Sequence, residues 1–349
     1  MQTEYFIVDK NHLDKQTMQR AAELLKRGKL VAFPTETVYG LGANGLDDQA
    51  VTKIYQAKGR PSDNPLILHI ANQREIIPLV TEIPANAQVL MDKYWPGPLT
   101  VVLKRTVVVP DIVSGGLDTV AVRLPANAIA RELIALAGMP IAAPSANTSG
   151  RPSPTSAQAV LADLDGRIDA IIDGGGCAIG VESTVVDCTT PVPTLLRPGG
   201  ITLEMLMDTL GEIEIAPALD GSPGCAPRSP GMKYTHYAPA APMILFEGTY
   251  PHIADRILQE IEVALGAGRK VGAIVSKETA QRLPTGVVSA VYGLRQHPME
   301  IAANLYTTLR SFDDSPVDII YAEGIPEAGL GLAVMNRLRK ASGYRIIKE

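Results

Sequence analysis

The chain has few of the residues that define several common protein classes. Its 349 residues include three cysteines, and Cys177, Cys188 and Cys225 form no Cys-x-x-Cys pair. This odd number without that spacing supports neither a disulfide framework nor a zinc motif, and it is typical of a reducing compartment. The chain also lacks a signal-peptide pattern and any run of about 18 apolar residues. We therefore expect a cytoplasmic protein that makes no membrane contact.

The chain lacks an excess of positive charge as well. Its 32 lysines and arginines are outnumbered by 37 aspartates and glutamates, which gives a formal net charge of −5. A protein that wraps nucleic acid through bulk positive charge is therefore disfavoured, although a local basic cleft stays open. With 46% hydrophobic and 20% charged residues, the composition is that of a globular protein with real cores. The length suffices for two domains of ordinary size.

Hydrophobic periodicity predicts alternating helices and strands over the first two hundred residues. One helix is predicted at about 14–27, ending at Gly28, and another runs from Asp47 or Asp48 to Lys58. The other predicted elements are strands at 29–33, 65–70, 99–104, 119–124, 139–143 and 168–173, helices at 85–93, 128–137 and 156–164, and a hairpin of 183–187 with 194–197. This alternation indicates an α/β sheet with covering helices over residues 1–211.

Prolines and glycines gather between residues 212 and 241, which predicts a linker. It carries Lys233, Tyr234, His236 and Tyr237 within a few residues, and exposed aromatic side chains invite association. We therefore expect the linker to dock on a surface as a lid over the active site. Beyond it, a smaller α/β domain is predicted over residues 242–349, with strands at 243–246, 270–275, 287–292 and 317–321 and helices at 252–265, 298–309 and 330–341.

The segment Gly40-Leu-Gly42-Ala-Asn-Gly45 matches the glycine spacing of a dinucleotide-binding fingerprint. In that motif the helix begins inside the glycine run, whereas here Asp47 and Asp48 follow as a separate helix cap. We therefore interpret the glycines as residues that permit a tight turn from strand to helix. No phosphate-binding P-loop sequence occurs in the chain.

Two polar segments have the composition of an anion and nucleotide site. Residues 58–69 gather Lys58, Arg60, Asn64 and His69, with prolines that favour an extended, rigid loop. Residues 144–153 gather hydroxyls, an amide and a guanidinium around turn-forming residues. Such groups bind phosphate or carboxylate oxygens. Taken singly, each has a plainer explanation: a solvated helix end, a buried histidine on a strand, or an ordinary polar loop.

Arg123 lies in an alternating strand, where a charge is unexpected unless it meets solvent or an anion. Thr119 precedes it by four residues and therefore lies on the same face of the strand. The two side chains are predicted to form a pair of donors suited to a carboxylate or a phosphate.

Five segments in combination resemble the YrdC-like domain of threonylcarbamoyl-AMP synthases. They are Pro34-Thr-Glu-Thr-Val-Tyr-Gly-Leu-Gly, Lys58-Gly-Arg60-Pro, Pro144-Ser145-Ala-Asn147-Thr-Ser-Gly, Glu182-Ser183-Thr184 and Arg197-Pro-Gly. The linker and second domain resemble the long form of that family. The resemblance implies a YrdC-like twisted mixed sheet with covering helices, followed by a smaller Rossmann-like α/β domain. It also implies a nucleotidyltransferase, an L-threonylcarbamoyladenylate synthase.

In that reaction L-threonine, bicarbonate and ATP give threonylcarbamoyl-AMP and pyrophosphate, for threonylcarbamoyladenosine modification of tRNA. The resemblance places Thr37, His69, Arg123 and Ser183 around threonine, with Arg123 as the carboxylate partner. It places Arg60, Asn64, Thr119, Ala143 through its backbone, Ser145, Asn147, Ser153, Arg197 and Tyr237 around ATP. Lys58 and Arg60 are the predicted catalytic residues, and Lys58 and Asn147 are expected to reach the phosphates.

The expected cofactor is Mg²⁺ bound with ATP, held by phosphates and water rather than by a dedicated protein metal site. No side chain stands out as a general base, so solvent, bicarbonate or a phosphate oxygen stays open for that role. The expected partners are the three substrates and the downstream machinery that transfers threonylcarbamoyl to tRNA, with a weak contact to tRNA itself.

Two rival functions stay open. One is a carbamoyl-adenylate synthase of the hydrogenase-maturation type, which also has a YrdC-like domain. Those proteins carry acylphosphatase-like and zinc-finger segments, and this chain has neither. The other is a module that binds double-stranded RNA or tRNA through a basic cleft, which the acidic net charge disfavours.

Overall fold

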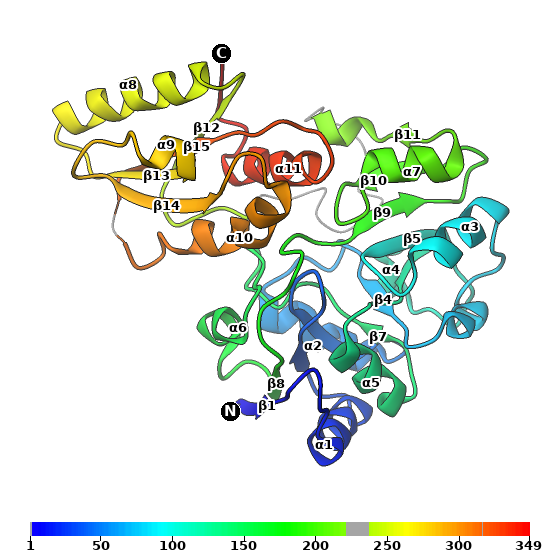
Figure 1. Ribbon diagram of the computed structural model, residues 1–349. Coiled ribbons are helices and arrows are strands. Elements are labelled where there is room, and N and C mark those ends of the chain that lie inside the picture. The colour runs from blue at the N-terminus through cyan, green and yellow to red at the C-terminus, as the bar shows by residue number, and fades with distance from the viewer. Residues whose placement is uncertain (1, 221–236, 316) are drawn as a thin grey trace. The chain divides into compact units, whose positions relative to one another are not determined.

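A computed structural model describes residues 2–220, 237–315 and 317–349 of the chain (Figure 1). It divides into two compact units. The first comprises Met1–Ser149 and Ser153–Lys233, and the second comprises Gly150–Pro152 and Tyr234–Glu349. Each unit is a sheet with helices, so the predicted α/β class is confirmed.

The first unit is built on one mixed sheet of eleven strands, which contains both parallel and antiparallel pairs. The order of its strands is β1 (Glu4–Ile7), β8 (Ala170–Asp173), β2 (Val31–Phe33), β3 (Gly40–Asn44), β7 (Ile141–Ala142), β4 (Ile67–His69), β6 (Thr119–Arg123), β5 (Leu99–Lys104), β9 (Thr184–Asp187), β10 (Thr194–Arg197) and β11 (Glu214–Ile215). Its helical segments are α1 (Lys15–Lys26), α2 (Asp48–Lys58), η1 (Gln73–Leu79), α3 (Ala85–Tyr94), α4 (Asp111–Ser114), α5 (Ala128–Ala137), α6 (Ala157–Leu164), α7 (Leu203–Leu210) and η2 (Pro217–Asp220).

The core of the first unit follows from amphipathic helices packed on strands. Helices α1 and α5 lie together, and their apolar faces cover β2 and β8 in one cluster of buried side chains (Figure 1). Helix α1 buries Met18, Ala21, Ala22 and Leu25, the spacing that places side chains on one face of a helix. Burial of this face anchors the sheet on which the polar residues of the candidate site stand.

Helix α2 shows why Lys58 has a fixed position. Asp47 caps its first turn by accepting hydrogen bonds from the N–H groups of Gln49 and Ala50. Gly59 ends it in the left-handed conformation, at φ 61°. Lys58 is therefore the last residue of the helix, and its side chain is buried although it is charged.

The interpretation of the glycine run as a strand-to-helix turn holds for Gly45, which lies in the turn between β3 and α2, but is wrong for Gly40 and Gly42, which lie inside strand β3. This strand pairs antiparallel with β2 on one side and β7 on the other. The glycines are needed for close packing: a Cβ at Gly42 would lie 2.8 Å from a ring carbon of Phe33 and 2.9 Å from Cγ2 of Ile141. The helix cap at Asp47 and Asp48 was predicted correctly.

The second unit is a five-stranded parallel sheet with helices on both faces. Its strand order is β14 (Val288–Gly293), β13 (Val271–Ser276), β15 (Ile319–Glu323), β12 (Met243–Glu247) and β16 (Ile346–Lys348). Its helices are α8 (His252–Gly266), α9 (Lys277–Ala280), α10 (Pro298–Arg310) and α11 (Gly331–Ala341). Helix α8 packs on the face formed by β12, β13 and β15, and α10 packs with α11 (Figure 1). The predicted Rossmann-like architecture is confirmed.

Contacts among the described residues join Gly150–Pro152 to this second unit. The N–H of Ala238 donates to the Gly150 carbonyl at 3.1 Å, the Arg151 guanidinium pairs with Asp313, and Arg310 donates to the Pro152 carbonyl. The 150–152 segment is therefore held by side chains and backbone far away in the sequence.

Part of the predicted linker 212–241 has regular structure. Glu214 and Ile215 form β11 at the edge of the large sheet, parallel to β10, and η2 follows. Lys233, Tyr234 and His236 lie outside the described residues, so the lid stays a prediction. Across the described residues, no helix combines the length and the apolar character that crossing a membrane requires.

Candidate active site

Strand register brings three of the polar side chains into one row. His69 in β4 lies opposite Arg123 in β6, and Thr100 in β5 lies opposite the same arginine. Residues opposite each other on neighbouring strands point to the same face of a sheet. All three side chains are buried, and Arg123 is only 4% exposed.

The Arg123 guanidinium is held from three sides. Its Nη2 donates to Oε1 of Glu36 at 2.7 Å, its Nη1 donates to the Thr37 hydroxyl at 2.9 Å, and its Nε donates to the Gly97 carbonyl at 3.3 Å. A guanidinium has five N–H groups. Two of them, one on each terminal nitrogen, are therefore left without a partner among the described residues.

The charges around Arg123 are well defined at neutral pH. Burial alone would raise the pKa of Glu36, but the charge of Arg123 and its hydrogen bond outweigh burial and lower that pKa below its ordinary value. Burial first, and then the charge of Arg123, lower the pKa of His69 to about 3. Glu36 is therefore ionised and His69 is neutral, so this part of the site contains one paired anion and cation.

Ser183 connects this group to a second cation. Its hydroxyl lies 2.8 Å from the Thr100 hydroxyl, and Nη2 of Arg197 donates to it at 3.1 Å. Nε of Arg197 donates to the carbonyl of the same serine at 3.0 Å. The structure thus brings Ser183, predicted for threonine, into contact with Arg197, predicted for ATP.

Lys58, Ser145 and Asn147, which come from two of the motifs, form one cluster. The Lys58 ammonium donates to the backbone carbonyls of Ser145 and Asn147, and the Ser145 hydroxyl donates to Oδ1 of Asn147 at 2.5 Å. Lys58 is 1% exposed. Its ammonium thus holds the 145–147 turn in shape, a contribution that the sequence did not predict.

The other residues predicted for ATP lie in loops of the first unit. Ser153 is buried and donates to Oε1 of Glu182 at 2.6 Å. The Arg60 guanidinium donates to the carbonyls of Asn64 and Pro65, at 3.4 and 3.2 Å. Oδ1 of Asn64 is buried and accepts no hydrogen bond from any described residue. A buried amide oxygen without a donor is suited to a ligand that brings one.

Thr119, Ala143 and Tyr237 were also predicted for ATP, and their surroundings differ from those of the loop residues. Thr119 begins β6 and Arg123 ends it, a separation of roughly 13 Å at about 3.3 Å per residue. They do not form the predicted donor pair for one anion, because that distance exceeds the size of a carboxylate. The N–H of Ala143 already donates to the Ile67 carbonyl at 3.0 Å.

Tyr237 belongs to the second unit, where it is buried and stacks on Tyr306 at 5.3 Å between ring centroids. Arg337 lies over the same ring, 5.9 Å from its centroid. The backbone of Tyr237 has a φ of 66°, which is strained for a residue with a side chain.

Sequence reasoning gave no role to Glu36, Thr100 or Glu182. Glu36 and Glu182 stand inside the motifs of the resemblance, so their position was a usable signal. Thr100 lies in an apolar strand with no local sign of function, and only its register with Arg123 reveals it.

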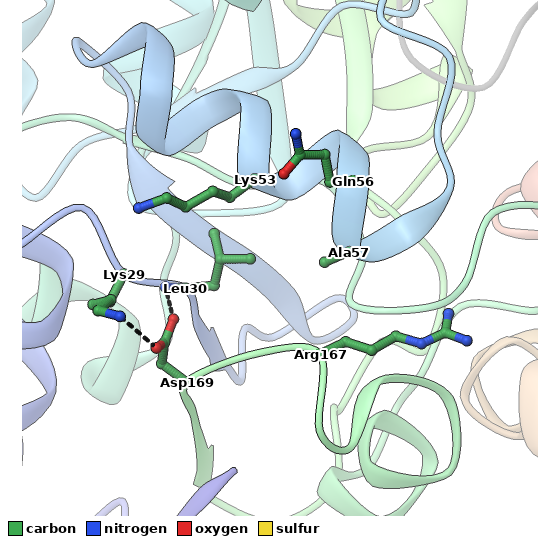
Figure 2. Close-up of a pocket in the computed structure, with 7 residues that line it drawn as sticks. All are labelled: Lys29, Leu30, Lys53, Gln56, Ala57, Arg167 and Asp169. Atoms are coloured by element: carbon green, nitrogen blue, oxygen red, sulfur yellow. Dashed lines mark hydrogen bonds and ion pairs between the residues drawn. The ribbon is translucent and has the colours of Figure 1, made fainter. Parts of the chain in front are cut away.

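A separate cavity of about 450 Å³ lies beside α2, lined by Lys29, Leu30, Lys53, Gln56, Ala57, Arg167 and Asp169 (Figure 2). Its cations do not converge. Nζ of Lys29 lies 3.3 Å from Asp169, Nζ of Lys53 donates to the Gly28 carbonyl at 2.7 Å, and Arg167 extends in another direction (Figure 2). Since none of the predicted site residues lines it, we do not assign the active site to this cavity.

Comparison with known proteins finds matches to both units of the chain. Residues 23–199 match a family model described as "Telomere recombination", and residues 201–343 match one described as "Threonylcarbamoyl-AMP synthase, C-terminal domain". The chain is 52% identical over 339 residues to a threonylcarbamoyl-AMP synthase of Pyrococcus abyssi, covering 97% of this chain and 98% of that protein. The chain belongs to the threonylcarbamoyl-AMP synthase family.

Two further relatives of this threonylcarbamoyl-AMP synthase family member cover almost its full length. A threonylcarbamoyl-AMP synthase of Bacillus subtilis is 49% identical over 350 residues, covering 98% of this chain and 97% of that protein. The crystal structure of P. abyssi Sua5 complexed with L-threonine is 52% identical and superposes with a TM-score of 0.94, covering 99% of this chain and all of that one. Both units therefore belong to the family architecture.

Proposed function

We propose that this chain converts L-threonine, bicarbonate and ATP into threonylcarbamoyl-AMP and pyrophosphate, acting as a nucleotidyltransferase. Its membership of the threonylcarbamoyl-AMP synthase family supports this function over a carbamoyl-adenylate synthase or an RNA-binding module. The observation that carries the proposal furthest is the Glu36–Arg123 pair beside neutral His69, because a buried pair with two remaining donors suits an amino-acid carboxylate.

In the threonine half of the site, the two remaining N–H groups of Arg123 would receive the carboxylate. The neutral His69 ring and the hydroxyls of Thr37 and Ser183 would hydrogen-bond the rest of the amino acid. These groups stand on strands or are bonded to strands, so they are positioned before substrate arrives.

In the nucleotide half, Arg60, Asn64, Ser145, Asn147, Ser153 and Arg197 would surround ATP, with Thr119 and Ala143 at its margin. Lys58 would contribute by holding the 145–147 turn, whose shape then presents hydroxyl and amide groups to the phosphates. The expected contact of Tyr237 with nucleotide stays a prediction.

The bond-forming step joins a carbamate oxygen of N-carboxythreonine to the α-phosphorus of ATP, and pyrophosphate leaves. Before that step the amine nitrogen of threonine bonds to the bicarbonate carbon, the C–OH bond of bicarbonate breaks and water leaves, and the ammonium group gives up a proton. Glu36 has a lowered pKa and His69 has a pKa of about 3, so both are weak bases near neutral pH. We assign the proton to bicarbonate, solvent or a phosphate oxygen, and the protein contributes positioning and charge stabilisation.

Mg²⁺ would enter with ATP. Over residues 2–220, 237–315 and 317–349, no three or more carboxylate, histidine or cysteine side chains are grouped to hold a metal ion. The phosphates and water would therefore supply its ligands. The product would pass to the machinery that modifies tRNA. Direct contact with tRNA and location in the cytoplasm stay predictions.

Pyrophosphate release tests this function directly. The purified chain with ATP, Mg²⁺ and bicarbonate should release pyrophosphate when L-threonine is added, and omission of bicarbonate should abolish the release. Release without threonine, or none with all substrates present, would overturn the proposal. Asp111→Asn, a change at a surface pair with Arg105 in the same unit, provides a variant expected to keep full activity.

A further inference from the structure

Glu36 is the anionic partner of Arg123, and no part of the proposed reaction uses its carboxylate directly. It lies in the turn that follows β2, and its side chain is 13% exposed. Oε1 accepts from Nη2 of Arg123 at 2.7 Å, and Oε2 accepts from the N–H of Asn127 at 3.3 Å. Its backbone carbonyl accepts from the N–H of Ile179 at 2.9 Å. The carboxylate is therefore fixed in position at both oxygens.

This carboxylate determines the net charge around Arg123. The hydroxyls of Thr37, Thr100 and Ser183 carry no charge, His69 is neutral, and burial raises the pKa of the Cys177 thiol to about 12. A further cation, Arg197, donates to Ser183 and is predicted for the nucleotide half. With Glu36 ionised, the threonine half carries no net charge before substrate arrives.

The pair therefore distinguishes between two kinds of ligand. A lone buried arginine attracts any small anion, because its charge is uncompensated. An arginine already paired with a carboxylate gains little from a second plain anion. It gains more from a ligand that brings both a carboxylate and a cationic amine, since the ligand then repels Glu36 less. Free threonine is such a zwitterion.

We propose that Glu36 is a positioning residue that orients the Arg123 guanidinium and makes this site select a zwitterionic amino acid over a simple carboxylate. This inference rests on the proposed function, because it assumes that threonine binds at Arg123. A purely structural role for Glu36 would change stability and threonine affinity but would leave the preference between the two ligand classes unchanged.

The test compares L-threonine with 3-hydroxybutyrate, which has the same carboxylate and hydroxyl but no amine. Titration calorimetry on the full chain measures both affinities in the wild type and in Glu36→Gln, whose amide oxygen can still accept from Arg123. Loss of the anion should weaken threonine binding and strengthen 3-hydroxybutyrate binding, so that the preference for threonine over 3-hydroxybutyrate narrows by at least about tenfold. Glu36→Asp keeps the charge and should retain the preference while binding threonine more weakly.

Three results would overturn the inference: an unchanged preference in Glu36→Gln, a preference lost equally in Glu36→Asp, or equal threonine affinity in all three proteins. If Glu36→Gln does not fold, as its melting temperature would show, the wild type itself decides: it should bind L-threonine at least about tenfold more tightly than 3-hydroxybutyrate, and equal affinities would overturn the inference. Pyrophosphate release by the wild type separates the two proposals. If the wild type releases no pyrophosphate, the proposed function fails. If it does release pyrophosphate, but Glu36→Gln keeps the same preference for threonine as the wild type, only the inference about Glu36 fails.

Discussion

The two halves of the site, which we propose for threonine (the threonine half) and for ATP (the nucleotide half), bury their cations in different ways. Arg123 is paired with an ionised carboxylate, so its surroundings carry no net charge. Lys58 donates to the backbone carbonyls of Ser145 and Asn147. The first arrangement suits a zwitterion, and the second fixes the turn that we propose faces the phosphates.

The two halves also differ in what positions them. The threonine half depends on the register of β4, β6 and β5, which lines up His69, Arg123 and Thr100. The nucleotide half depends on turns joined by side-chain bonds to backbone carbonyls. Strand register is rigid, whereas a turn relies on the few contacts that hold it, so we expect single substitutions to affect the two halves differently.

The largest effect is expected from Arg123→Met. It leaves Glu36 buried without its partner, so the free energy of unfolding should fall by about 3–5 kcal/mol, as for other broken buried pairs. Threonine affinity should fall at least about 100-fold, while ATP affinity stays close to wild type. Denaturant unfolding measures the stability, and calorimetry measures the two affinities. Arg282→Met, which removes a surface pair with Asp255, is the matched control and should change neither the stability nor the affinities. Equal loss of both affinities would contradict the separation of the halves.

A smaller effect, on ATP rather than on threonine, is expected from Lys58→Met. Loss of the ammonium removes the donor that the structure shows for the Ser145 and Asn147 carbonyls, at a cost of about 1–3 kcal/mol in unfolding free energy. The turn should loosen, so the KM for ATP should rise by about 10- to 100-fold while threonine affinity changes little. Lys53→Met is the matched control, because that lysine lies on the same helix and also donates to a backbone carbonyl, but at the surface. A change in kcat alone would instead favour a direct catalytic role.

His69 tests whether the threonine half stays electrically neutral. Its folded pKa of about 3 lies below the ordinary value of 6.5, so the unfolded chain binds the proton more readily. Stability is therefore fully present above pH 6.5 and is lost as pH falls toward 3. Between pH 7 and 5 the wild type should lose about 2 kcal/mol more than His69→Gln. The lowered pKa of Glu36 acts only below about its ordinary value of 4.5, outside this window. Parallel stability curves would show that His69 is not held neutral.

The smallest effect is expected from Ser183→Ala, because Ser183 touches both halves and each hydroxyl bond contributes only about 1 kcal/mol. Affinities for threonine and for ATP should both fall, by about three- to fivefold. Ser311→Ala, in the second unit, provides a control whose hydroxyl bonds only the Thr308 carbonyl. An effect confined to one substrate would show that Ser183 does not connect the halves.

Much of the fold could be predicted because local patterns determine it. The spacing of apolar residues predicted α5 and β5 with their observed bounds, and Asp47 with Gly59 marks both ends of α2. Strand β3 was missed because glycines read as a turn, whereas here they allow side chains of Phe33 and Ile141 to pack against the backbone. Contacts between residues as far apart in the sequence as Gly42 and Ile141 cannot be predicted from the local sequence.

The sequence by itself determined which residues are predicted to carry the chemistry, because the motifs around Thr37, Lys58, Ser145 and Ser183 are short and local. Only the tertiary structure decided how they act on one another. Arg123 meets Glu36 across 87 positions, Lys58 meets Ser145 across 87, and Ser183 meets Thr100 across 83. Such pairs depend on the order and register of strands, which no local pattern encodes, and burial then sets their charges.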